Sequence, residues 1–131
     1  MKNKKETGKL GEKIAENYLE AKGYQILEKN YFLKPKGSPL LGEIDIIAKK
    51  EDTICFVEVK TLVKSLSAGF AGDFSPEQRV NFKKRKKIAK VAEIWLTKNK
   101  IPLDSNWQID LLSIVFDLQC KKAKIRHFQN I

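Results

Sequence analysis

Two strand-like segments that follow each other closely constrain the fold of this chain more than any other feature. The first, Gly42 to Lys49, is apolar apart from its acids, and the second, Thr53 to Leu62, is rich in β-branched and aromatic residues. The polar run Lys49 to Asp52 has the composition of a turn. The sequence therefore predicts a β-hairpin with a four-residue loop.

The other segments carry the signals of two helices and three strands. A helix is predicted from a cap at Thr7 to about Lys22, and a second from the Ser75-Pro76 start signal to about Asn99. Three strands are expected at Gln25 to Phe32, Trp107 to Phe116 and Lys121 to Phe128. The order α-β-β-β-α-β-β predicts a single α/β domain over residues 1–131, with a mixed β-sheet flanked by helices.

Each predicted helix has one apolar face. In the first helix the stripe consists of Leu10, Ile14, Tyr18 and Ala21, widened by Ala15 and Leu19. In the second helix the residues expected to be buried are Ile88, Val91, Ala92, Trp95 and Leu96. Glu12 falls at the edge of the first stripe, so it can reach the end of the sheet, although an ordinary solvated carboxylate is the alternative.

Composition excludes several classes of protein. The chain has 131 residues, of which 42% are hydrophobic, and this favours one globular domain over a disordered chain. Apolar runs such as Ile44 to Ala48 fall far short of the about 20 residues of a membrane span. The basic residues 1–10 are not followed by the apolar segment of a secretory signal. We therefore expect a cytoplasmic protein without a membrane partner.

The cysteines and the histidine favour structural roles. Cys55 and Cys120 lie far apart in the sequence, each in an apolar or strand-like setting. Buried free thiols are expected there, rather than a disulfide or a zinc site. His127 is expected to be a hydrogen-bonded strand or surface histidine and not a metal ligand.

Positive charge is concentrated in short segments. The chain has 26 Lys and Arg against 16 Asp and Glu, a formal net charge of +10. Lys83 to Lys90 contains six basic residues in eight, and Lys121 to Arg126 contains four in six. Such clustering is typical of proteins that bind nucleic acid, although a merely lysine-rich surface is the alternative.

Acidic side chains interrupt the two strands of the predicted hairpin. With a four-residue loop, Ala48 would pair with Thr53, so that Asp45 lies opposite Phe56 and Glu43 opposite Glu58. The carboxylates of Asp45 and Glu58 would then be diagonal neighbours on one face. Carboxylates in such apolar strands are costly unless a cation compensates them.

A divalent cation is one such compensation. Mg²⁺ is commonly held by one or two carboxylates together with water and substrate phosphate, and Asp45 and Glu58 fit that need. Lys60 shares a face with Glu58 and could hold the attacking water or stabilise charge on a phosphate. This combination predicts phosphodiester hydrolysis, whereas the alternative is a simple salt bridge between Glu58 and Lys60.

The motifs resemble those of a known family over nearly the whole chain. They are Gly8-Lys-Leu-Gly-Glu12, Asn30-Tyr31, Gly42-Glu-Ile-Asp-Ile-Ile-Ala48, Phe56-Val-Glu-Val-Lys-Thr61 and Ser75-Pro-Glu77. In order and spacing they are similar to those of the YraN-like family of small bacterial proteins. That family is itself similar to archaeal Holliday-junction resolvases and to the PD-(D/E)XK nuclease-like fold.

The resemblance implies a restriction-endonuclease-like core and assigns roles to individual residues. Asp45 and Glu58 would bind the metal, Lys60 would be the catalytic lysine, and Glu12 would be an additional acid. Lys84 on the second long helix would face nucleic acid, and we expect its neighbours Lys83 and Lys87 to contribute there. Relatives that act on four-way junctions are dimers, so a homodimer is a further expectation.

Three functions are consistent with these patterns. The first is an endonuclease that depends on Mg²⁺ or Mn²⁺ and hydrolyses DNA, with junctions or flaps as candidate substrates. The second is a non-catalytic nucleic-acid-binding module on a nuclease-like fold. The third is an interaction protein whose basic face meets an acidic partner.

Overall fold

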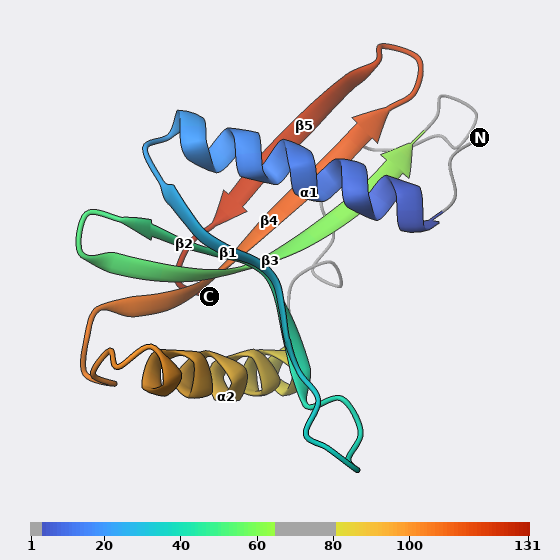
Figure 1. Cartoon of the computed structure of the whole chain (residues 1–131). Helices are drawn as coiled ribbons and strands as arrows, with labels where there is room; N and C mark the ends of the chain where they lie inside the picture. The colour runs from blue at the N-terminus through green and yellow to red at the C-terminus, as the bar shows by residue number, and fades with distance from the viewer. Residues whose placement is uncertain (1–3, 65–80) are drawn as a thin grey trace.

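The computed structural model describes residues 4–64 and 81–131 and has the predicted order of elements (Figure 1). These elements are α1 (Lys4–Ala21), β1 (Gln25–Leu33), β2 (Gly42–Lys50), β3 (Thr53–Lys64), α2 (Phe82–Lys98), β4 (Trp107–Asp117) and β5 (Lys122–Phe128). The strands form one sheet in the order β1-β2-β3-β4-β5. Only β3 and β4 are parallel neighbours, so the sheet is mixed, as predicted.

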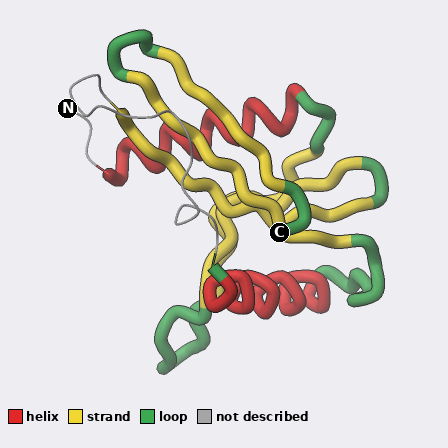
Figure 2. The backbone as a smooth tube through the Cα atoms, turned by 180° about the vertical axis from the view of Figure 1, so that it is seen from behind, coloured by secondary structure: helices red, strands yellow, loops and turns green. Residues whose placement is uncertain are grey.

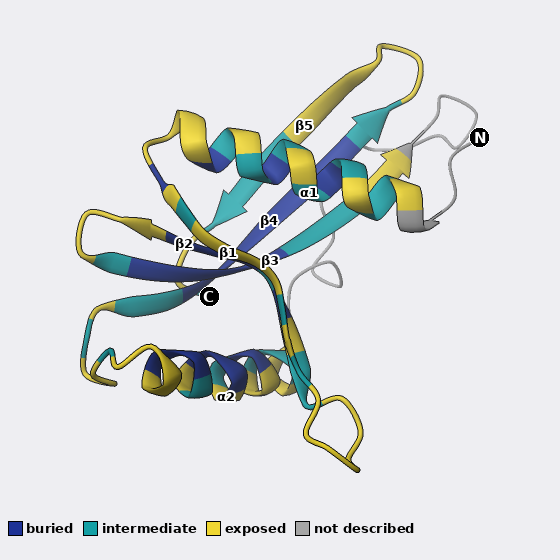
Figure 3. Cartoon of the chain, viewed as in Figure 1, coloured by how far each residue is buried: buried dark blue, intermediate teal, exposed yellow. Residues whose placement is uncertain are grey.

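The two helices lie on opposite faces of the twisted sheet (Figures 1 and 2). Successive side chains of β3 alternate between these faces: Cys55 and Val57 pack towards α1, and Ile54 and Phe56 pack towards α2. The central strands are therefore buried on both sides (Figure 3), which explains their nearly continuous apolar sequences.

Helix α1 packs through small residues. Its fully buried face consists of Gly11, Ala15 and Leu19, spaced four residues apart. Gly11 lies against β3 so closely that a Cβ atom there would collide with the Oγ1 atom of Thr61. The sequence predicted Ala15 and Leu19, but it missed Gly11, and it wrongly included Ala21, which is exposed at the end of the helix.

Helix α2 begins later than predicted. The start signal at Ser75 and Pro76 lies outside the described residues, and Asn81 is extended and not helical. Asn81 caps the helix, because its side-chain oxygen accepts a hydrogen bond from the backbone N–H of Lys84 at 2.8 Å. A continuous helix from Pro76 is therefore wrong, whereas all five residues predicted to be buried on this helix are buried.

The register of the β2–β3 hairpin differs from the prediction. Its loop has two residues, Glu51 and Asp52, because Lys49 and Lys50 belong to the strand. Ala48 consequently pairs with Cys55 and not with Thr53. The predicted pairings of Asp45 with Phe56 and of Glu43 with Glu58 are wrong for the same reason.

Cys55 and the side chain of His127 are buried inside the fold, whereas Cys120 lies at its surface. Both cysteines are free, as predicted; Cys55 is buried, but Cys120 is exposed in the turn between β4 and β5, which corrects its predicted burial. The side chain of His127 is 7% exposed, and its Nε2 atom lies 2.8 Å from Oδ2 of Asp110. Its predicted role as a hydrogen-bonded strand histidine is confirmed.

Across residues 4–64 and 81–131, neither α1 nor α2 combines the length and the apolar character that crossing a membrane requires.

Candidate active site

Strands β2 and β3 stop pairing where the acidic residues begin. The last paired residues are Ile46 and Val57, and one residue further along each strand are Asp45 and Glu58. Beyond this point the Asp45 carboxylate accepts a hydrogen bond from the backbone N–H of Val59 at 2.8 Å. A side chain thus replaces the strand-to-strand hydrogen bond, and it fixes the Asp45 carboxylate against β3 beside Glu58.

Glu58 is the most buried acid of this group. The residue is 7% exposed in the middle of β3, where it pairs with Leu111 of the parallel strand β4. Its Oε1 atom lies 2.7 Å from Nζ of Lys84 and 3.9 Å from Nζ of Lys60. The Glu58–Lys60 salt bridge considered from the sequence therefore exists only as a long contact, and the close partner comes from α2.

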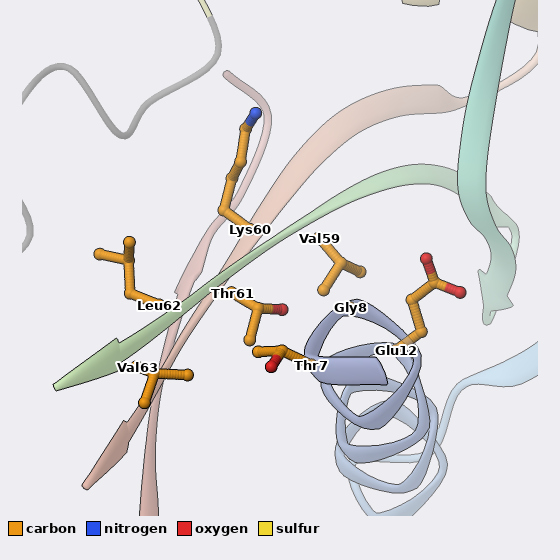
Figure 4. Close-up of a pocket in the computed structure, with 8 residues that line it drawn as sticks. All are labelled: Thr7, Gly8, Glu12, Val59, Lys60, Thr61, Leu62 and Val63. Carbon is orange, nitrogen blue, oxygen red and sulfur yellow. The ribbon is translucent and has the colours of Figure 1, made fainter. Parts of the chain in front are cut away.

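Lys60 leaves β3 on the side opposite α1. Figure 4 shows its side chain pointing away from that helix, whereas Val59 and Thr61 lie on the helix side of the strand. Burial, together with the neighbouring Lys84, lowers the pKa of Lys60 below its ordinary value. Such a lysine releases its proton more readily than an exposed one does.

Glu12 approaches the site from α1. It lines a cavity of about 480 Å³ together with Gly8 and residues of β3 (Figure 4). A second cavity, of about 260 Å³, is shared by Glu12, Asn30 and Asp45. Glu12 is therefore partly buried and shares a cavity with Asp45, which favours a place in the site over the ordinary solvated carboxylate that the sequence left open.

Burial and neighbouring acids raise the pKa of two carboxyl groups, those of Asp45 and Glu12. Burial, and then the negative charges of Glu58, Glu12 and Glu43, raise the pKa of Asp45 to about 7, against the opposing hydrogen bond from Val59. Burial also raises the pKa of Glu12, and the side-chain hydrogen bond with Asn30 offsets part of this increase. The four carboxylates thus form a region of negative potential, which Lys84 and Lys60 partly compensate at Glu58.

Asp45 and Glu58 are the two residues that could hold a hard divalent cation. Within residues 4–64 and 81–131, no group of three or more His, Cys, Asp or Glu side chains is arranged to hold a metal ion. Asp45 and Glu58 alone would supply two oxygen ligands, and water and substrate would complete the coordination, as is usual for Mg²⁺. The raised pKa of Asp45 fits this assignment, because a cation would compensate a charge that the site otherwise disfavours.

Lys84 and Lys87 line the α2 side of the site, whereas Lys83 is exposed on the same helix. Lys87 is exposed and lines a cavity of about 200 Å³ together with Glu43, Glu58 and Lys84. Burial alone would lower the pKa of Lys84, but its hydrogen bond with Glu58 raises the pKa above the ordinary value. The sequence did not predict the pairing of Lys84 with Glu58.

The sequence named Lys84 as a nucleic-acid contact but not its place beside Glu58, and that place had a signal: Lys84 precedes Ile88 by one helical turn, so it lies on the face that packs on the sheet. One further residue of the site, Asn30, was missed. Asn30, in β1, has a φ of 53°, a left-handed conformation that few residues other than glycine and asparagine adopt. An asparagine within a strand-like segment was therefore the sequence signal for this left-handed conformation.

Fold and site together define a class of protein: a small α/β protein whose mixed sheet carries an acid-and-lysine site between two helices. Residues 11–114 match the uncharacterised protein family UPF0102, and the chain belongs to this family. This confirms the YraN-like assignment that the motifs predicted. The matched range contains every residue of the candidate site.

Its relatives are similar along most of their length. A UPF0102 protein of Clostridioides difficile (strain 630) is 52% identical over 99 residues, which cover 76% of each chain. One from Alkaliphilus oremlandii is 43% identical over 126 residues, 96% of this chain and 97% of the relative. One from Acetivibrio thermocellus is 41% identical over 129 residues, 98% of this chain and 90% of the relative.

Proposed function

We propose that the protein is an endonuclease of the PD-(D/E)XK, restriction-endonuclease-like type that uses Mg²⁺ or Mn²⁺ to hydrolyse DNA. The observation that carries the proposal is the meeting of Asp45, Glu58 and Lys60 where β2 and β3 separate. Two partly or fully buried carboxylates beside a lysine are costly for the fold, and a catalytic role accounts for that cost.

Each side chain has a distinct part in this chemistry. A bound divalent cation would polarise the phosphate and promote deprotonation of water. Asp45 would present a carboxylate held in one orientation by the Val59 N–H, and Glu58 would present a second from the adjacent strand. Lys60, whose pKa is lowered, would orient the attacking water or stabilise charge on the phosphate.

Glu12 would act from the α1 side of β3, whereas Lys60 points away from that helix (Figure 4). Glu12 shares a cavity with Asp45, and its raised pKa reflects burial near the other acids. A carboxylate in that position could orient water next to the cation without binding the cation directly. Glu12 is therefore assigned to water positioning.

Basic residues on α2 support a nucleic-acid substrate. Lys87 is exposed beside the acidic site, Lys83 is exposed one turn earlier on α2, and the chain has a net charge of +10. Lysines at such positions attract phosphate and compensate the negative potential of the carboxylates. Four-way junctions and flaps are candidate substrates, and a homodimer is the form that would suit a four-way junction.

Cation binding and DNA cleavage, measured on the same variants, test the proposal. Mg²⁺ and Mn²⁺ would be titrated into wild type, Asp45→Asn and Glu58→Gln by calorimetry, and each protein would be incubated with labelled duplex, flap and four-way-junction DNA. Loss of both cation binding and cleavage in the two variants is expected, with DNA binding retained. Glu20→Gln, which removes an exposed acid of α1, is the matched control. Undiminished cleavage by either site variant contradicts the proposal.

One observation favours a second candidate, a non-catalytic nucleic-acid-binding module. The 2.7 Å ion pair with Lys84 already compensates Glu58 without any metal. This alternative predicts salt-dependent DNA binding by wild type, no calorimetric signal with Mg²⁺ or Mn²⁺, and no turnover of any of the three DNA substrates.

A further inference from the structure

The backbone of Lys84 is held in place on α2, whereas its long side chain is partly exposed. Its backbone N–H is tied to the Asn81 cap, and Ile88, one turn later, is buried against the sheet. The side chain itself is 41% exposed at the mouth of the cavity shared by Glu43, Glu58 and Lys87. The ammonium group could therefore change partners while the helix stays in place.

The partner it has in this structure is the carboxylate that the proposed function assigns to the cation. Nζ of Lys84 lies 2.7 Å from Oε1 of Glu58, a charge-assisted hydrogen bond. The side chain of Glu58 is only 9% exposed, so little water reaches the carboxylate to compensate its charge. An ammonium group and a divalent cation at this carboxylate would repel each other.

We propose that the ammonium group of Lys84 pairs with the Glu58 carboxylate in the absence of metal. When the divalent cation binds, Lys84 leaves this carboxylate and contacts a phosphate of the bound nucleic acid. This inference rests on the proposed function, because it takes Glu58 as a cation ligand. It makes Lys84 a residue that links cation binding to substrate binding. It also explains how a buried glutamate is tolerated in β3 before the cation arrives.

A simpler role would be a structural link between α2 and β3. In that case the loss of Lys84 would lower stability without changing cation affinity. A role in holding Glu58 in the right orientation would instead make the loss of Lys84 weaken cation binding. The exchange predicts the opposite sign, so the direction of the change distinguishes all three roles.

The test compares Lys84→Gln with Lys87→Gln. Both variants remove one positive charge from the same cavity lining, but only the first removes the contact with Glu58. Mn²⁺ and Mg²⁺ would be titrated by calorimetry into each DNA-free protein, and thermal melting would verify that each is folded. We expect Lys84→Gln to bind the cation about fivefold more tightly than Lys87→Gln does, the factor that corresponds to a modest ion pair. Lys84→Arg should restore the wild-type affinity.

A second measurement tests whether Lys84 contacts a phosphate of the nucleic acid once the cation is bound. The affinity for a labelled DNA duplex would be measured as a function of salt, with EDTA and with Ca²⁺. With Ca²⁺, Lys84→Gln should weaken binding and reduce the slope of log K against log salt by about one, as expected for one lost phosphate contact. With EDTA its effect should be smaller, because Lys84 is then engaged by Glu58.

The outcomes separate this inference from the proposed function. If wild type binds the cation and Lys84→Gln binds it equally well or more weakly, the exchange is overturned, but the proposed function is not. A wild-type protein that binds neither Mg²⁺ nor Mn²⁺ would overturn the proposed function, and the exchange with it. Tighter cation binding in Lys84→Gln, with the Ca²⁺-dependent loss of DNA affinity, would establish the exchange.

Discussion

The carboxylate of a single residue, Asp45, lowers the stability of the folded protein when it is ionised. Its carboxylate is partly buried beside Glu58, and both features raise its pKa to about 7. The hydrogen bond from Val59 holds it in place but does not offset the burial. At neutral pH the folded protein therefore contains a charge that the unfolded chain would solvate better.

Asp45→Asn should stabilise the protein at alkaline pH and have little effect in acid. The pKa of Asp45 is higher in the folded state than in the unfolded chain, so the folded state binds a proton that the unfolded state has released. Wild-type stability should therefore fall as the pH rises from about 4 to about 7, by up to roughly 4 kcal/mol. The asparagine does not titrate and keeps an oxygen to accept the Val59 N–H.

Urea unfolding at about pH 5 and about pH 8 measures this difference. Asp104→Asn, an exposed substitution of the same kind, provides the control and should show no such pH dependence. An equal effect of Asp45→Asn at both pH values would show that the carboxylate is not disfavoured in the folded state.

At the scale of secondary-structure elements, α1 packs closely against β3. Gly11 allows the helix to approach the strand, and its neighbour Thr61 follows the catalytic candidate Lys60 directly. The closeness of this contact sets how near Glu12, the next residue of the helix, comes to the acids of β2 and β3. The glycine is therefore needed for space, although glycine weakens a helix interior.

Gly11→Ala should destabilise the protein by about 1–3 kcal/mol, because the added methyl group overlaps with Thr61 and outweighs the better helix propensity of alanine. Adding Thr61→Ala should recover most of the loss, since the overlap is chiefly with the Thr61 hydroxyl group. Thermal melting of the two single variants and the double variant gives the coupling between the positions. Simple additivity of the two effects would show that the residues are not in contact.

Strands β4 and β5 are joined by a buried polar network centred on Asp110. Its carboxylate contacts His127 at 2.8 Å and accepts hydrogen bonds from Gln108 and from the backbone N–H of Asn130, both at 2.9 Å. Burial alone would raise the pKa of Asp110, but these partners lower it below the ordinary value. The network therefore stabilises the folded protein through an ionised carboxylate.

Asp110→Asn should cost about 1–3 kcal/mol near neutral pH, because an amide replaces the charged acceptor in a buried site. The sign of the pH dependence is opposite to that of Asp45. The lowered pKa of Asp110 gives stability that is complete above the unfolded value of about 4 and is lost as the pH falls through the folded value. Urea unfolding from about pH 3 to about pH 7 should show the two curves converging in acid. A constant difference over this range would contradict the role of the charge.

Charge distribution is a property of the whole molecule. The net charge of +10 contrasts with the acidic site at the separation of β2 and β3, and exposed lysines of α2 lie next to that site. A polyanion drawn to the surface would thus meet lysines beside the carboxylates. Salt dependence of binding measures how many of these lysines contact phosphate.

Lys83→Gln should weaken DNA binding in a way that depends on salt, with the slope of log K against log salt reduced by about one. Lys100→Gln removes an equal charge just beyond the opposite end of α2 and should leave the slope unchanged. Fluorescence anisotropy over a salt series distinguishes the two. Equal effects of both variants would indicate a diffuse charge effect and no local contact.

Local patterns in the sequence were sufficient for the order of the elements and for the choice of candidate site residues. Apolar spacing placed Ile88, Val91 and Trp95 on the buried face of a helix, because helical periodicity is a local property of the chain. Acids in strands of isoleucine and valine identified Asp45 and Glu58, because unmatched charge in such strands is costly wherever they pack.

Contacts between distant segments were decided only by the tertiary structure. The two-residue loop, and with it the true register of β2 and β3, depends on how the strands twist and pack and not on turn composition alone. The placement of Lys84 on Glu58 and of Gly11 on Thr61 joins helices to a strand far away in sequence. Sequence by itself therefore determined which groups are the candidates for the site, and packing decided which of them meet, because that depends on distances between elements that no local pattern encodes.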